Sequence, residues 1–284
     1  SVPRAMARLG CIDLRRGDPK AAADHAQRAL DRDADHPLAP AVLLLAQCAL
    51  GLEEEAARTA ARALARDPPN LLILWLSRTP EAFFAPLSSD PAQSVLDLCE
   101  DFDAMGQTGQ ILSLLEGLSR WRPEFMGAMP WYLTAYFAEK AGLSPDAALA
   151  AAESAPLGES YPVRPLEAQA LRFAHARGSV RAGFLLGCLL YDKRHYEEGA
   201  ALFEEAVRRQ PEDAAACRCL AVARFSHQGQ GKEALELMLR ALALRPCAQL
   251  LYETVILMDK LSCPPQEKLE LMQANAALIT RDDL

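Results

Sequence analysis

Apolar residues recur along this chain at intervals of three and four, which is the spacing of one face of an α-helix. The clearest example covers residues 180–213, where Leu186 and Leu190 lie one turn apart on a first helix and Phe203 lies on a second. Pro211 follows the second helix, because proline cannot continue the hydrogen-bond ladder. The sequence has no run of strand-like alternation. The pattern therefore predicts antiparallel helix hairpins and an all-α fold.

The predicted hairpins recur at a steady interval. Leu220 follows Leu186 by 34 residues, and the dipeptide beginning at Ala63 repeats the one at Ala29 with the same separation. A period in this range is typical of α-solenoids, in which each hairpin covers the apolar face of its neighbour. The interval predicts two repeat units in residues 1–70. A further set of repeats is predicted in residues 161–284.

Residues 71–160 keep the helical periodicity but lose the recurring positions, so we expect a degenerate middle section of helical hairpins. The helix pair at the end of 161–284 is expected to cap the array. Together the three segments predict one continuous solenoid, a superhelix of antiparallel hairpins.

Several of the recurring residues match a known signature. Leu186-Gly187, Phe203 and Pro211 have the type and spacing of the tetratricopeptide repeat, with Gly199 in place of its usual alanine. The chain therefore resembles the tetratricopeptide repeat (TPR) superfamily. This resemblance implies a TPR-like superhelix whose first helices line a concave face that binds other proteins.

A narrower resemblance covers roughly residues 71–284, and the residues that carry it lie after residue 160. The chain there looks like the C-terminal TPR region of a family of large bacterial multidomain proteins, which carry an N-terminal β-rich domain of unknown function. The residues that carry this likeness are Tyr161-Pro162, Arg164, Glu167, Leu171, Leu186-Gly187, Leu190-Tyr191-Asp192-Lys193 and Tyr196-Glu197-Glu198. The resemblance implies that this chain is the helical part of a longer protein.

Composition and charge narrow the function classes. The net charge is −8, and an acidic chain repels phosphate backbones, so nucleic acid is not an expected partner. The longest apolar stretch, 38–52, contains Pro40 and is too short to cross a bilayer, so no membrane association is expected. The eight cysteines are dispersed, and Cys217 and Cys219 would point to different faces of a helix. This spacing favours reduced thiols in a cytoplasmic protein, with no metal site.

Nothing in the sequence assembles into a catalytic site. Catalysis needs titratable groups in a fixed geometry, and the five histidines lie in separate helical segments. The adjacent carboxylates have the pattern of solvated helix faces. We therefore expect no enzyme activity, no catalytic residue and no cofactor.

The candidate site is a groove on the predicted first helices of the last section. The best-known peptide-binding TPR proteins use lysine and asparagine there, and this chain does not, although Arg218 would suit a carboxylate. For Phe184 and Tyr191, packing between helices is an equally open interpretation. The predicted groove residues are Arg181, Phe184, Cys188, Tyr191, Arg218 and Phe225.

These observations predict a noncatalytic interaction or scaffold module that binds a peptide, a partner protein or its own N-terminal domain on the concave face. The alternative is an accessory module of a carbohydrate-active enzyme, with glycans stacking on Trp131 or Tyr132. The cluster from Trp131 to Phe137 has a second interpretation, as core. The sequence leaves the oligomeric state open.

Overall fold

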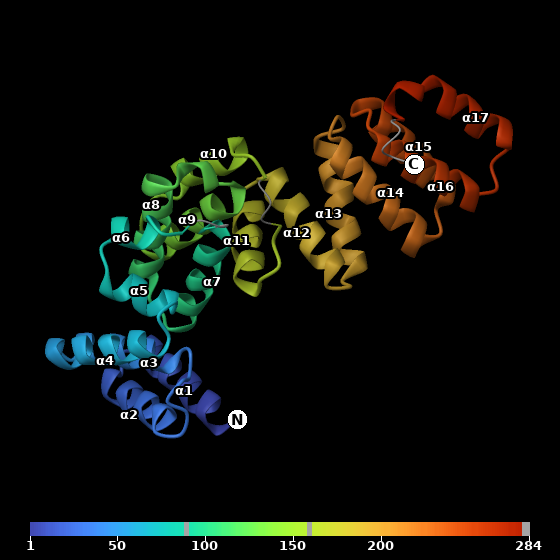
Figure 1. Ribbon diagram of the computed structural model, residues 1–284. Coiled ribbons are helices and arrows are strands. Elements are labelled where there is room, and N and C mark those ends of the chain that lie inside the picture. The colour runs from blue at the N-terminus through green and yellow to red at the C-terminus, as the bar shows by residue number, and fades with distance from the viewer. Residues whose placement is uncertain (88–90, 158–160, 280–284) are drawn as a thin grey trace. The chain divides into compact units, whose positions relative to one another are not determined.

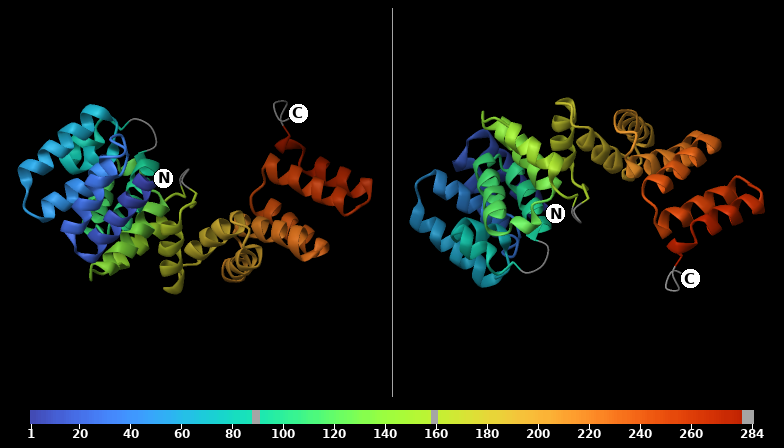
Figure 2. Two further views of the ribbon diagram at one scale, coloured as in Figure 1. Left: turned by 90° about the horizontal axis from the view of Figure 1, so that it is seen from below. Right: turned by 90° about the horizontal axis from the view of Figure 1, so that it is seen from above.

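The computed structural model describes residues 1–87, 91–157 and 161–279. In these ranges the regular elements are helices, without a strand, which confirms the predicted all-α class (Figures 1 and 2). The chain divides into two compact units, Ser1–Ser160 and Tyr161–Leu284. Among the described residues, no helix combines the length and apolar character needed to span a membrane.

The first unit consists of successive helix hairpins, in which most helices contact the next one along the chain. Its helices are α1 (Val2–Arg16), α2 (Pro19–Leu30), α3 (Ala39–Ala49), α4 (Glu53–Arg66), α5 (Leu71–Ser77), α6 (Pro80–Phe84), α7 (Pro91–Ala104), α8 (Thr108–Trp121), the short 3-10 helix η1 (Pro123–Phe125), α9 (Ala128–Lys140) and α10 (Asp146–Ser154).

Local chemistry sets the first hairpin turn. Gly17 ends α1 in the left-handed conformation, with φ of 76°, which a residue with a side chain adopts only at a cost. The Asp18 carboxylate then accepts a hydrogen bond of 3.0 Å from the Ala21 amide, and Pro19 occupies the first position of α2. Three consecutive residues thus stop one helix and start the next.

Helix α3 is the buried centre of the N-terminal hairpins. Every residue from Ala39 to Ala46 is buried, because α1, α2, α4 and α5 all contact this helix. A helix covered on all sides has little amphipathic character, which is why the apolar run here shows no clear polar face.

Helices α1 and α7 meet although they lie far apart in the sequence. The Arg15 guanidinium donates hydrogen bonds to the backbone carbonyl of Asp103 and to its carboxylate, the latter at 3.2 Å. Gly106 permits this approach, since a Cβ added there would lie 3.0 Å from the Arg15 Cα atom. The repeat period does not predict this contact between α1 and α7.

The carboxyl group of Asp101, also on α7, lies partly out of water. Burial, assisted by the charges of Glu100 and Asp97, raises the pKa of Asp101 from 3.8 to about 6. Its charge acts in turn on the buried thiol of Cys11 in α1, whose pKa rises to about 11, mainly through its own burial. Asp101 is therefore more easily accommodated as the neutral acid.

We expect Asp101→Asn to stabilise the first unit by roughly 1–2 kcal/mol near pH 7.5 and to have little effect near pH 4. The folded-state pKa lies above the unfolded value, so the protonated group's contribution is complete below about pH 4 and lost as pH rises through about 6. The full shift corresponds to about 3 kcal/mol, and partial exposure screens it to the lower figure. Thermal unfolding followed by tryptophan fluorescence reports on this unit, because Trp75, Trp121 and Trp131 all lie in it. A larger gain at pH 4 than at pH 7.5 would contradict the prediction.

The second unit repeats the hairpin arrangement, again with contacts between successive helices. Its helices are α11 (Pro165–Ala176), α12 (Val180–Asp192), α13 (Tyr196–Arg209), α14 (Ala214–Gln228), α15 (Gly231–Leu244), α16 (Ala248–Lys260), α17 (Pro265–Ala274) and the short 3-10 helix η2 (Ala276–Leu278). No residue of α17 is buried, whereas α14, α15 and α16 share a continuous apolar core.

The hairpin of α12 and α13 shows why the repeat positions recur. Phe203 is buried between the two helices, and its ring lies beside that of Phe184 with centroids 5.9 Å apart. A Cβ added to Gly187 would lie 2.8 Å from the Phe203 ring, and one added to Gly199 would lie 3.0 Å from the Gly187 carbonyl oxygen. The two glycines let the helices approach closely, and the aromatic ring fills the remaining space.

Candidate functional site

The second unit carries a groove on the side of its first helices, between α14 and α16. Its volume is about 200 Å³. Val222 and Phe225 of α14 face Ile256 of α16 across it, and the buried Met238 of α15 contributes to its floor. The groove is therefore mainly apolar in its middle, with charged side chains at its ends.

Helical spacing explains how the sequence builds these walls. Arg218, Val222 and Phe225 lie four and three residues apart and share one face of α14. On α16, Glu253 and Ile256 share a face in the same way. Both helices are backed by the core of the unit, so their positions within the unit are held by packing.

One end of the groove is an ion pair. Arg218 donates from Nε and Nη2 to the two carboxylate oxygens of Glu253, at 2.6 and 2.7 Å, a bidentate geometry. Gln249 adds a third hydrogen bond to Glu253, at 3.1 Å. The pair raises the pKa of Arg218 and lowers the pKa of Glu253, mainly through these hydrogen bonds. A ligand carboxylate at Arg218 would therefore compete with Glu253.

The other end carries a positive charge over an aromatic ring. The Lys260 ammonium lies 5.7 Å from the centre of the Phe225 ring, within the range of a cation–π contact. Tyr252, one turn before Ile256 on α16, is 67 % exposed. This exposed ring lies on the same face of α16 as Ile256, near the Glu253 end of the groove.

The structure divides the six groove residues predicted from sequence. Arg218 and Phe225 line the α14–α16 groove, and Arg181, Phe184, Cys188 and Tyr191 do not. Phe184 is only 7 % exposed and packs on Phe203. The ring of Tyr191 lies against Tyr196, Phe203 and His227. For these two aromatic residues the structure shows the helix-packing arrangement that the sequence left open.

Sequence reasoning missed the α16 wall of the groove, which includes Glu253, Ile256 and Lys260. The sequence did not indicate Glu253, because its partner Arg218 lies on α14, the first helix of the preceding repeat. The fold also brings together Cys188 of α12 and Cys219 of α14, whose thiols share a hydrogen bond. That bond lowers the pKa of Cys219, with help from the positive charge of nearby Arg218, and it raises the pKa of Cys188, with help from burial of that thiol. The repeat period implies that first helices of successive repeats stack side by side. That stacking was the one feature of the sequence that could have indicated the pairs Arg218–Glu253 and Cys188–Cys219.

The aromatic cluster of α9 belongs largely to the core of the first unit. Tyr132 and Phe137 are fully buried, and the Tyr132 hydroxyl donates a hydrogen bond of 2.9 Å to Glu153. Trp131 and Tyr136 keep partial exposure, and the Lys140 ammonium lies 4.5 Å from the centre of the Tyr136 ring. Sugar stacking requires an exposed ring face, which neither Tyr132 nor Phe137 offers.

Both units are built from successive helix hairpins that cover one another's apolar faces, which defines a helical repeat protein. The family model of the tetratricopeptide repeat matches residues 8–70 and 184–248, one stretch in each unit. Both units therefore contain tetratricopeptide repeats.

Several solved structures are similar to the chain at low identity. MamA (41-end) from Desulfovibrio magneticus RS-1 is 16 % identical, with a TM-score of 0.38 over 68 % of this chain and 96 % of its own. A tetratricopeptide repeat protein from Parabacteroides merdae ATCC 43184 is 15 % identical, with a TM-score of 0.34 over 99 % of this chain and 95 % of its own. PilF from Pseudomonas aeruginosa is 14 % identical, with a TM-score of 0.32 over 89 % of this chain and 96 % of its own. A search of curated proteins found no match.

Proposed function

We propose that this chain is a noncatalytic interaction module whose second unit binds a peptide segment of a partner protein in the α14–α16 groove. The observation that carries the proposal is an apolar groove, with Val222, Phe225 and Ile256 in its walls, on the first-helix side of a tetratricopeptide array. Stacked hairpins present extended surfaces of this kind for binding.

The size and charge of the groove define the ligand. A volume of about 200 Å³ is below the range of pockets that enclose whole small molecules, so a single bulky side chain is the natural occupant. The flanking Arg218–Glu253 pair and Lys260 offer polar contacts to the backbone on either side. The ligand is therefore an extended or helical peptide anchored by one apolar residue.

An adjoining domain of the same protein is one source of such a peptide, given the resemblance of residues after 160 to the helical part of multidomain proteins. Arg181, Phe184, Cys188 and Tyr191 then belong to the neighbouring hairpin, where Arg181 and Cys188 extend the first-helix face. Continuity of that face through the whole chain, as one solenoid, stays a prediction.

Ile256→Asn is expected to weaken binding of peptides selected from a random library on the full chain about tenfold, or about 1.4 kcal/mol. The reason is the loss of apolar contact at the anchor side chain. Leu239→Asn is the matched control: Leu239 is 37 % exposed and Ile256 is 36 % exposed, and Leu239 does not line the groove. Anisotropy of labelled peptides measures both affinities. Equal affinities for the two variants, or a library that yields no binder, would overturn the proposal.

A further inference from the structure

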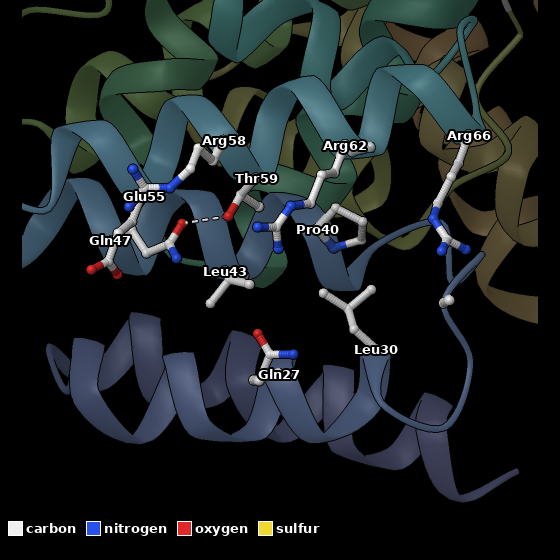
Figure 3. Close-up of a pocket in the computed structure, with 12 residues that line it drawn as sticks. Gln27, Leu30, Pro40, Leu43, Gln47, Glu55, Arg58, Thr59, Arg62 and Arg66 are labelled. Atoms are coloured by element: carbon white, nitrogen blue, oxygen red, sulfur yellow. Dashed lines mark hydrogen bonds between the residues drawn. The ribbon is translucent and has the colours of Figure 1, made fainter.

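The first unit has a second groove, on the side of its second helices. It lies between α2 and α4 over α3, with a volume of about 370 Å³. Figure 3 shows Gln27 and Leu30 of α2 on one side and the side chains of α4 on the other. Pro40 and Leu43 of α3 supply apolar surface between them. This groove differs from the α14–α16 groove in position and in charge.

Three arginines make one wall of the α2–α4 groove positive. Arg58, Arg62 and Arg66 are four residues apart, so they form a row along one face of α4 (Figure 3). Glu55 is the one carboxylate among the described residues that line the groove. A positive wall of this kind is unexpected in a chain whose net charge is −8.

The middle arginine is available to a ligand. Arg66 pairs with Asp35 at 3.1 Å and Arg58 with Glu54 at 3.5 Å, both in exposed positions where ion pairs contribute little. Arg62 has no ion pair or hydrogen bond with any described residue of the chain, and its guanidinium lies over the groove near Pro40 and Leu30 (Figure 3). A ligand that displaced the weak pairs of Arg58 and Arg66 could therefore bind all three guanidinium groups.

The second unit contains an equivalent crevice, which serves as an internal comparison. It lies between α13 and α15 over α14, with a volume of about 570 Å³. Aligning Ala29 with Ala206 and Ala63 with Ala241, the repeat positions of each unit, superposes the two sets of lining residues in sequence. The crevice is thus a consequence of hairpin stacking, and its shape alone indicates no ligand.

The charges in the two crevices differ. In the second unit, Glu236 occupies the position of Arg58, and Glu204 occupies the position of Gln27. Glu204 pairs across the crevice with Arg224, at 3.1 Å. The cations there are balanced by carboxylates of the same crevice, whereas those of the α2–α4 groove are not. Packing of the repeat therefore does not require the arginine row.

We propose that the α2–α4 groove binds an acidic segment of a partner protein. Its carboxylates, spaced by about one helical turn, would meet the arginine row, since guanidinium groups bind carboxylates in bidentate fashion. An apolar side chain between them would lie on Leu30 and Leu43. A protein segment fits this surface better than nucleic acid, because apolar floor contacts accompany the charge and the rest of the chain is acidic.

The test uses the full chain and a fluorescein-labelled peptide in which pairs of glutamates alternate with leucine and alanine. We expect Arg62→Glu to weaken binding at least tenfold, because it replaces an attractive charge by a repulsive one. Arg240→Glu, at the equivalent position of the second unit, is expected to stay within twofold of the parent. Because Arg62 is exposed and unpaired, the variant should keep the parent melting temperature, which circular dichroism checks.

Several outcomes would overturn the inference. These are equal binding by Arg62→Glu and the parent, an equal loss in Arg240→Glu, equal binding of a peptide with glutamine in place of glutamate, or tighter binding of a single-stranded oligonucleotide. Ile256→Asn is expected to leave acidic-peptide binding within twofold. Its failure to do so would show that the peptide binds the α14–α16 groove instead, so the two proposals are tested separately.

Discussion

Replacing Phe203 by alanine is expected to destabilise the hairpin of α12 and α13 by about 3–5 kcal/mol, which is the range for removing a fully buried phenylalanine. The ring is only 2 % exposed, and it lies beside Phe184 and Tyr191. Gly187 and Gly199 offer no side-chain atoms that could close the resulting cavity. The neighbouring helices would therefore lose contacts without regaining them.

Hydrogen exchange measured by mass spectrometry is the appropriate readout, because a repeat array need not unfold in one step. Protection should fall throughout 180–209 in Phe203→Ala. Phe225→Ala is the control, since that ring is partly exposed at the α14–α16 groove and should cost about 1 kcal/mol or less. Unchanged exchange over α12 and α13 in the Phe203 variant would show that the ring does not hold the hairpin together.

Glu167→Ala is expected to have a comparable effect, about 3–5 kcal/mol, at the start of the second unit. Glu167 is 1 % exposed at the first turn of α11. Its carboxylate accepts hydrogen bonds from the amides of Val163 and Arg164, at 2.6 and 2.8 Å, and from the Arg164 guanidinium at 2.9 Å. Removing the carboxylate would leave two partly buried amides and a largely buried guanidinium without their acceptor.

Urea unfolding of the full chain measures this loss, with hydrogen exchange of the α11 amides as the readout. Glu198→Ala is the matched control, because Glu198 is exposed and its contact with His195 is 3.6 Å long, so less than about 1 kcal/mol is expected. Equal effects of the two substitutions would contradict the capping role of Glu167. The capping geometry also gives a physical reason for the pair Arg164 and Glu167, which the sequence analysis named only among the residues of a family resemblance.

The α14–α16 groove and the α2–α4 groove are both formed by stacked hairpins, but their lining residues differ in charge. The first-helix groove of α14 and α16 is apolar, and the second-helix groove of α2 and α4 is basic. Because the grooves lie in different units and have different lining residues, the two proposals together predict that one chain holds two partner segments at once, as a scaffold would.

By itself, the sequence determined the secondary structure and the hairpin cores of this protein. Leu186, Gly187 and Phe203 are buried where their spacing predicted, because an i to i+4 pattern on a helix needs only local geometry to be expressed. Gly17-Asp18-Pro19 likewise sets a turn through local backbone preferences. The repeat period then predicted which helices would be neighbours.

Only the tertiary structure decided which charged and polar groups meet. The pairs Arg15–Asp103 and Arg218–Glu253, like the thiols Cys188 and Cys219, join helices that are not consecutive. The arginine row of α4 became one wall of a groove only when α2 packed beside it over α3. These contacts depend on the packing angle and separation of whole helices, which many side chains set together, and no local spacing encodes that sum.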